Sequence, residues 1–153
     1  MGFNDILKKI FGNKSQRDMR EIQPYVETIK AAYETIKPLT NDELRTKIDD
    51  IKQEIQDAVS SEKERIAQLK EEVEKLPYEK REGYWHEIDK LEKTILDKYE
   101  AKLNEVMPVV YAVVKDTARR FAESEEVVVT ATEFDRTLAA EGRDFVRIEG
   151  DKA

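Results

Sequence analysis

The chain has 153 residues, of which 40% are charged and 39% hydrophobic; its net charge is −7 and its mean hydropathy −0.73. It contains no cysteine, which excludes disulfides and thiolate chemistry, and no apolar run approaches the ~20 residues that cross a membrane. Because so polar a composition is typical of long exposed helices, we expect a soluble, cytoplasmic protein.

Positive charge is concentrated at the start of the chain. Residues 1–20 carry five basic and two acidic side chains, whereas residues 41–106 carry thirteen basic and nineteen acidic ones. Phosphate contacts require clustered cations, so this distribution argues against a nucleic-acid partner.

The first helical segment is short and amphipathic. Residues 3–11 place their apolar side chains on one helical face and their lysines off it, a pattern typical of helices that lie in a membrane interface. Packing of the same face on the protein itself or on a partner is the alternative. The membrane or partner contact residues that we expect are Phe3, Ile6, Leu7, Lys8, Lys9, Ile10, Phe11 and Lys14.

A second helix is predicted over residues 16–37, with a kink or restart at Pro24. It is followed by the sequence PLTNDEL, which has the features of a helix start. Thr40 and Glu43 have the spacing of a capping box, and Leu39 and Leu44 that of a hydrophobic staple.

A helical hairpin is predicted over residues 42–106. From Asp42 to Leu76 there is no glycine or proline, which predicts a helical rod of about 50 Å. Apolar residues recur along it at heptad spacing, with one surplus four-residue step that is called a stutter. After the break LPYEKREG, a second amphipathic stretch runs from Tyr84 to Val106. Two such helices joined by a short break favour an antiparallel pair.

Folding the chain about residue 80 gives a specific register. It brings Leu69 near Leu91 and Ile66 near Ile95, and it sets Glu62, the one charged residue in the apolar seam, beside Lys98. We predict that these two opposite charges pair.

The last third of the chain begins with a further helix that we expect to open at Met107-Pro108 and to end near Ser124. The β-branched run 126–132 and the run 145–148 are predicted as short strands, with a turn or short helix between them. The expected fold is therefore mainly α, with a long hairpin, shorter helices and one or two short strands. Because such strands need partners, we expect an N-terminal piece of a longer protein.

Catalytic motifs are scarce. His86 is the single histidine, and the sequence HEIDK has Lys90 where a zinc-protease motif requires a second histidine, so His86 is expected on a helix surface. The five glycines do not form a phosphate-binding loop. Tyr78, Tyr84 and Trp85 cluster at the expected hairpin tip, either as a partner contact or as packing for the end of the hairpin.

Four segments occur in an order that resembles the N-terminus of the SecA family of protein-translocating ATPases: FNDILKKIFG, SQRDMREI, PLTNDELRTKI and MPVVYAVVKDTARRF. The residues that match the third landmark are Leu39, Thr40, Asp42, Glu43 and Leu44. Those that match the fourth are Pro108, Tyr111, Ala112, Val113, Val114, Ala118, Arg119 and Arg120. Residues 48–104, which form the hairpin, are an insertion relative to the usual family pattern.

The resemblance implies four parts: an N-terminal helix (1–14), a helix and cap (15–41), the hairpin insertion (42–106), and the start of the first nucleotide-binding domain (107–153). It implies ATP and Mg²⁺ in the parent protein and no catalytic, cofactor or metal residue in this fragment. It also implies contact with an anionic membrane and the Sec translocon, the rest of the parent chain and a homodimer as partners, and a position at the inner face of the cell membrane. The alternatives are a coiled-coil adaptor or structural protein with a weak membrane helix, and a peripheral membrane module unrelated to secretion.

Overall fold

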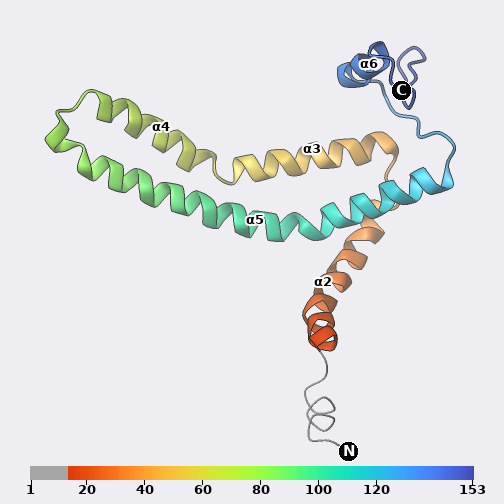
Figure 1. Cartoon of the computed structure of the whole chain (residues 1–153), viewed down its shortest axis with the longest axis horizontal. Helices are drawn as coiled ribbons and strands as arrows, with labels where there is room; N and C mark the ends of the chain where they lie inside the picture. The colour runs from red at the N-terminus through yellow and green to blue at the C-terminus, as the bar shows by residue number, and fades with distance from the viewer. Residues whose placement is uncertain (1–13) are drawn as a thin grey trace, which may run out of the picture. The chain divides into compact units, whose positions relative to one another are not determined.

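A computed structural model describes residues 14–153. Along these residues the chain forms a series of helices, labelled in Figure 1: α2 (Lys14–Ile36), α3 (Asn41–Asp57), α4 (Ser60–Glu74), the 3₁₀ turn η1 (Tyr78–Lys80), α5 (Glu82–Glu123) and α6 (Glu133–Ala140). The described part contains no β-strand, only isolated bridges. The chain divides into two compact units. One comprises Met1–Pro38 with Pro108–Glu125, and the other comprises Leu39–Met107 with Glu126–Ala153.

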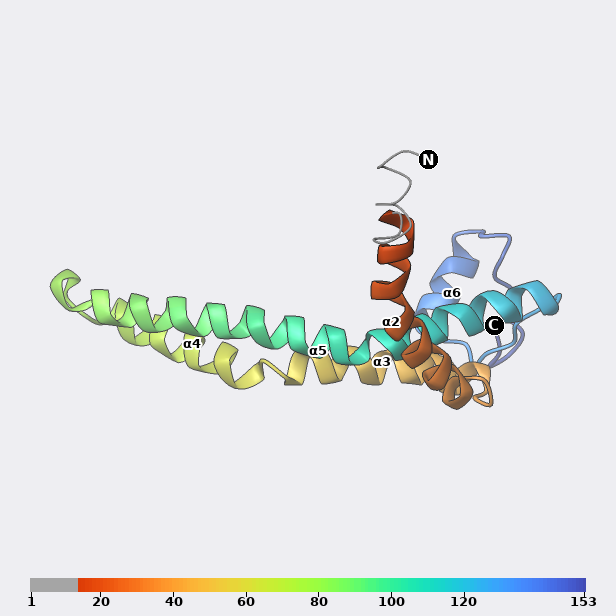
Figure 2. The same ribbon diagram turned by 90° about the horizontal axis from the view of Figure 1, so that it is seen from below.

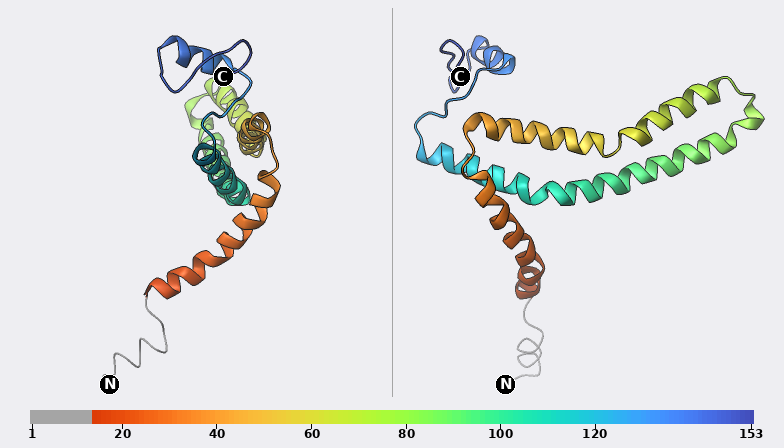
Figure 3. Two further views of the ribbon diagram at one scale, coloured as in Figure 1. Left: turned by 90° about the vertical axis from the view of Figure 1, so that its right-hand side faces the viewer. Right: turned by 180° about the vertical axis from the view of Figure 1, so that it is seen from behind.

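The predicted hairpin is confirmed. Helices α3 and α4 run back along the first part of α5, which they reach through the turn at η1, and this pairing is visible from every side (Figures 1–3). The apolar seam of the first arm is buried, as is that of α5. The buried seam residues are Leu44, Ile51, Val59, Ile66, Leu69 and Val73 on the first arm and Ile88 and Val106 on α5. Burial of these side chains is the main favourable term that holds the two arms together.

The register of the arms is the predicted one. Ile66 and Leu69 form one cluster with Ile88, against which Leu91 and Ile95 pack. Glu62 lies four residues before Ile66. Lys98 Nζ of the other arm donates a hydrogen bond to Glu62 Oε1 at 2.7 Å, as predicted. This hydrogen bond lowers the pKa of Glu62 below its ordinary value.

The first arm is not the unbroken rod that we expected. Helix α3 ends at Asp57 and α4 begins at Ser60, so Ala58 and Val59 interrupt it. The interruption coincides with the surplus four-residue step between Ile55 and Val59. A stutter locally unwinds the left-handed supercoil of heptad packing, and the helix is interrupted at this step. Val59 is fully buried at this point, with φ −124° and ψ 6°.

The prediction that a separate helix starts at Met107-Pro108 is also wrong. Helix α5 continues through Pro108 for 42 residues, about 63 Å at 1.5 Å per residue. Proline inside a helix removes one backbone hydrogen bond and costs about 3 kcal/mol. Burial of Ala112 and Val113 just beyond it offsets that cost. Pro24 lies inside α2 in the same way.

The two predicted C-terminal strands are not observed. Val129 exchanges backbone hydrogen bonds of 3.0 Å with Ala153, and the Ala131 N–H donates to Asp151 O at 2.7 Å. The run 126–132 therefore pairs with the last residues of the chain instead of with residues 145–148, and too few pairs form for a strand. The short helix expected between the two runs is confirmed as α6, which ends before Gly142 at φ +77°.

Truncation of the hairpin core has a predictable effect. We expect Leu69→Ala to destabilise the hairpin by about 3 kcal/mol, because Leu69 is fully buried and its removal leaves a cavity. The matched control is Leu96→Ala, since Leu96 is 68% exposed on the other arm, and its expected effect is within about 0.5 kcal/mol. Denaturant unfolding followed by the fluorescence of Trp85, the only tryptophan, measures both. Equal denaturant midpoints for the two variants would contradict the conclusion that burial of the apolar seam stabilises the hairpin.

Candidate interaction sites

Most of the predicted contact residues lie outside the described part of the chain. Phe3, Ile6, Leu7, Lys8, Lys9, Ile10 and Phe11 precede residue 14, so the prediction for them stays a prediction. Lys14 is the first residue of α2, and its side chain is exposed.

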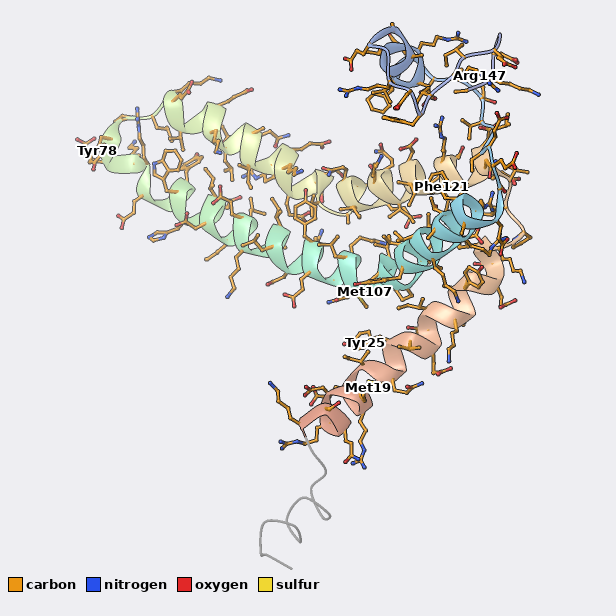
Figure 4. All side chains as sticks on the ribbon, turned by 45° about the vertical axis from the view of Figure 1, so that its right-hand side comes forward. Met19, Tyr25, Tyr78, Met107, Phe121 and Arg147 are labelled. Atoms are coloured by element: carbon orange, nitrogen blue, oxygen red, sulfur yellow. The ribbon has the colours of Figure 1, made fainter. Side chains whose placement is uncertain are left out.

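The first half of α2 presents an exposed apolar stripe. Met19, Ile22 and Tyr25 are 57%, 51% and 53% exposed, and Figure 4 shows Met19 and Tyr25 on this part of the helix. Further along α2 the same face becomes covered and ends at Ile36, which is 2% exposed. Helical periodicity alone does not distinguish the covered half of such a face from the exposed half.

A buried carboxylate joins α2 to the last part of α5. Asp116 is fully buried, and the Tyr33 hydroxyl of α2 donates a hydrogen bond of 3.2 Å to Asp116 Oδ1. Arg119 donates to the same oxygen at 2.9 and 3.0 Å, and Arg120 Nε donates to Oδ2 at 2.7 Å. The Lys115 ammonium lies 4.1 Å from the centre of the Tyr33 ring. We call Tyr33, Asp116, Arg119 and Arg120 the Asp116 cluster.

Two opposing effects set the ionisation of Asp116. Burial raises the pKa of Asp116. The hydrogen bonds and charges of Arg120 and Arg119 lower it by more than burial raises it, so the pKa lies below its ordinary value. The carboxylate is therefore charged at neutral pH and holds both guanidinium groups. The sequence analysis missed this role. The signal was an acidic residue three and four positions before two arginines.

The capping box predicted for PLTNDEL is confirmed. Thr40 Oγ1 accepts a hydrogen bond from the Glu43 N–H at 3.2 Å, and the Thr40 N–H donates to Glu43 Oε2 at 2.7 Å. These backbone and side-chain hydrogen bonds from Thr40 lower the pKa of Glu43.

The same turn of α3 also contacts residues almost ninety positions away. Asn41 Nδ2 donates to Val128 O at 2.9 Å, and Asp42 accepts two hydrogen bonds of 2.8 Å from the N–H and hydroxyl of Thr130. Arg45 forms a bidentate pair with Asp135 at 2.7 and 3.0 Å. These six residues form what we call the clasp. No local pattern in the sequence predicted it.

The hydrogen bonds from Arg45 hold the pKa of Asp135 well below its usual range, and those from Thr130 lower the pKa of Asp42. Both carboxylates are therefore charged at neutral pH, and the clasp is a set of charge-assisted hydrogen bonds.

The hairpin tip carries one tyrosine that is packed against the core and one that is exposed. Tyr84 packs against the hairpin core, whereas Tyr78 is 82% exposed at the turn, where Figure 4 labels it. Trp85 is 46% exposed. His86 lies on the surface of α5 as predicted, 3.8 Å from Glu82. Tyr84 therefore packs the end of the hairpin, whereas a partner contact by the exposed aromatic side chains stays a prediction.

Two classes of site were sought in the described residues. Within residues 14–153, no cluster of three or more His, Asp or Glu side chains has the arrangement of a metal site. In the same part of the chain, no helix has the length and apolar content required to cross a membrane.

The Asp116 cluster yields a graded prediction for the anchoring of α2. Tyr33→Phe removes one hydrogen bond and should cost about 1 kcal/mol, whereas Asp116→Asn removes a fully buried charge that Arg119 and Arg120 share and should cost about 3 kcal/mol. Native-state hydrogen exchange of the α2 amides between residues 26 and 36 measures both.

The pH dependence has a definite sign. Because folding lowers the pKa of Asp116, its stabilisation is fully present above the unfolded-state pKa of about 4 and is lost as pH falls through the lower folded value. The difference between wild type and Asp116→Asn should therefore shrink below about pH 4. A difference that grows on acidification would contradict this role.

Comparison with known proteins identifies the family. The model of the SecA DEAD-like domain matches residues 7–136. The protein translocase subunit SecA of Parabacteroides distasonis is 59% identical over 153 residues, which are 100% of this chain and 14% of that protein. The SecA subunit of Phocaeicola vulgatus is 56% identical with the same coverage. That of Amoebophilus asiaticus is 40% identical over 152 residues, 97% of this chain and 13% of the relative. No solved structure matches.

The chain thus spans about one seventh of the length of these relatives. The matches cover the whole chain, including the hairpin and the four segments that resemble the family. The family model alone spans more than half of the chain, from before α2 into α6. The chain belongs to the SecA family.

Proposed function

We propose that this chain is the N-terminal segment of a Sec-pathway protein translocase motor, where it contacts the membrane and the translocon and supports the ATPase without catalysing a reaction itself. The support for a Sec-pathway role is the family, whose members carry the name protein translocase subunit SecA. The protein would then act at the inner face of the cell membrane as a peripheral protein.

The observation that carries the membrane contact is the pairing of apolar and basic residues at the start of the chain. Residues 3–11 have one apolar helical face, with Lys8 and Lys9 off that face. The apolar stripe of α2 follows, uncovered by any described residue, with Arg17 and Arg20 beside it. Apolar side chains enter the headgroup region while cations meet anionic lipids, and together they give weak, reversible binding.

The support for scaffolding comes from the Asp116 cluster. The buried Asp116 carboxylate accepts four hydrogen bonds and thereby holds α2 against α5. Helix α2 is therefore attached to a long, continuous helix. We propose a four-part division at residues 14, 41 and 106, with the hairpin as an insertion relative to the family pattern that the sequence resembles.

Nucleotide chemistry is assigned to the parent protein alone. The glycines of this chain lie at positions 2, 12, 83, 142 and 150, too far apart to form a phosphate-binding loop. We therefore propose that the phosphate-binding loop for ATP and Mg²⁺ belongs to another part of the parent protein.

An adaptor role of the hairpin is the second candidate, and a specific observation favours it. Tyr78 at the tip and Leu96 and Leu103 on α5 are 82%, 68% and 52% exposed, and Leu96 and Leu103 are seven residues apart, which places them on one face of the helix. A hairpin that serves only as a spacer has no need of them. A second copy of the chain is among the partners that such a surface would fit.

The membrane contact is tested by vesicle flotation of the 153-residue chain. We expect the chain to float with vesicles rich in phosphatidylglycerol and to remain unbound with phosphatidylcholine alone. Each lysine near an anionic surface contributes about 1 kcal/mol, so Lys8→Gln with Lys9→Gln should weaken binding about 30-fold.

The matched control removes two lysines from the hairpin, Lys90→Gln with Lys93→Gln, which leaves the N-terminal region intact while changing the net charge equally. Binding of this control should stay close to wild type. Undiminished flotation after deletion of residues 1–14 would exclude these residues as the membrane contact.

A further inference from the structure

The segment Glu126–Ala153 has almost no hydrophobic core of its own. Within this fully described segment only Val129 and Asp135 are buried, whereas Phe134 and Phe145 are 69% and 74% exposed. Burial of apolar surface therefore contributes little to its attachment, and polar contacts must hold it in place.

Hydrogen bonds within the segment close it on itself. Val129 pairs with Ala153, Ala131 donates to Asp151, and Arg136 Nη2 donates to Gly150 O at 3.1 Å. Thr132 and Asp135 form a second capping box at the start of α6. None of these bonds involves the hairpin, so the internal fold of the segment does not require contact with α3.

Attachment to the hairpin depends on three side chains of one helical turn. Asn41, Asp42 and Arg45 provide the hydrogen bonds of the clasp, and the Arg45–Asp135 pair is its only ion pair among the described residues. The Asp135 side chain is 7% exposed, so loss of Arg45 leaves a nearly buried carboxylate without its counter-charge.

We propose that the clasp is a releasable attachment: the segment Glu126–Ala153 separates from α3 as one unit while the hairpin stays folded, and Arg45 controls the separation. In the closed state the base of the hairpin and this segment move together, whereas in the open state each moves independently. The inference does not rest on membrane contact, because none of the residues involved belongs to the N-terminal region.

The contrast with the hairpin explains why opening stops at the clasp. The arms of the hairpin share several buried apolar side chains, which recur from Leu44 to Val73 on one arm. Polar contacts at the protein surface exchange readily with water, whereas a buried seam opens only with most of the structure. The segment therefore has a lower opening free energy than the arms.

Arg45→Met gives the clearest test, because Arg45 lies on α3 and takes no part in the internal bonds of the segment. Hydrogen–deuterium exchange of the 153-residue chain, resolved by mass spectrometry, would follow peptides from residues 126–153 and from residues 60–100. We expect exchange at Thr130, whose N–H donates to Asp42 in the clasp, to accelerate about a hundredfold in the variant, while amides that bond within the segment stay protected. Exchange in the hairpin should stay unchanged.

Two further variants sharpen the result. Arg147→Met removes a charge from the segment itself, where Arg147 forms exposed ion pairs with Glu126 and Glu149, and exchange should remain as in wild type. Arg45→Lys keeps the charge but loses the bidentate geometry, so it should give intermediate exchange.

Two results would overturn the proposal. Unchanged protection of the Thr130 amide in Arg45→Met would mean that the ion pair does not hold the segment. Simultaneous loss of protection in the segment and in the hairpin would mean that the two unfold as one body. Flotation on anionic vesicles is independent of both results, so failure of the clasp and failure of the proposed function are distinguishable.

Discussion

Burial of the apolar seam between α4 and α5 is the constraint on which the other features of the hairpin depend. Leu69 and Ile88 fix which residues of the two arms face each other, and the Glu62–Lys98 pair then follows from that register. The break at Ala58 and Val59 lies within the same seam, where Val59 is fully buried. Surface ion pairs alone would not hold two arms of this length together.

The sequence predicted those features of the fold that depend on local spacing. The hairpin, its register and the capping box at Thr40 follow from apolar periodicity and from side-chain preferences at helix ends. The strand prediction failed because β-branched residues only show a preference for extended backbone. Whether a strand forms depends on its partner, and Val129 pairs with Ala153 at the end of the chain.

The interaction sites were less accessible to such reasoning. Family membership was predictable because it depends on the order of short motifs. The Asp116 cluster and the clasp were not, since both depend on contacts between residues more than eighty positions apart, such as Tyr33 with Asp116 and Arg45 with Asp135. Continuation of α5 through Pro108 belongs to the same class, because packing beyond the proline outweighs a strong local preference.

The Asp135 carboxylate accepts hydrogen bonds from two different helix starts, and this limits which substitutions residue 135 can tolerate. One carboxylate accepts hydrogen bonds from Arg45 of α3 and from Thr132 at the start of α6. Glutamate would move the oxygens by one methylene and asparagine would remove the charge, so neither replacement preserves both sets of bonds. Drift at residue 135 is therefore tied to residues 45 and 132 together, and the three positions form a single unit of variation.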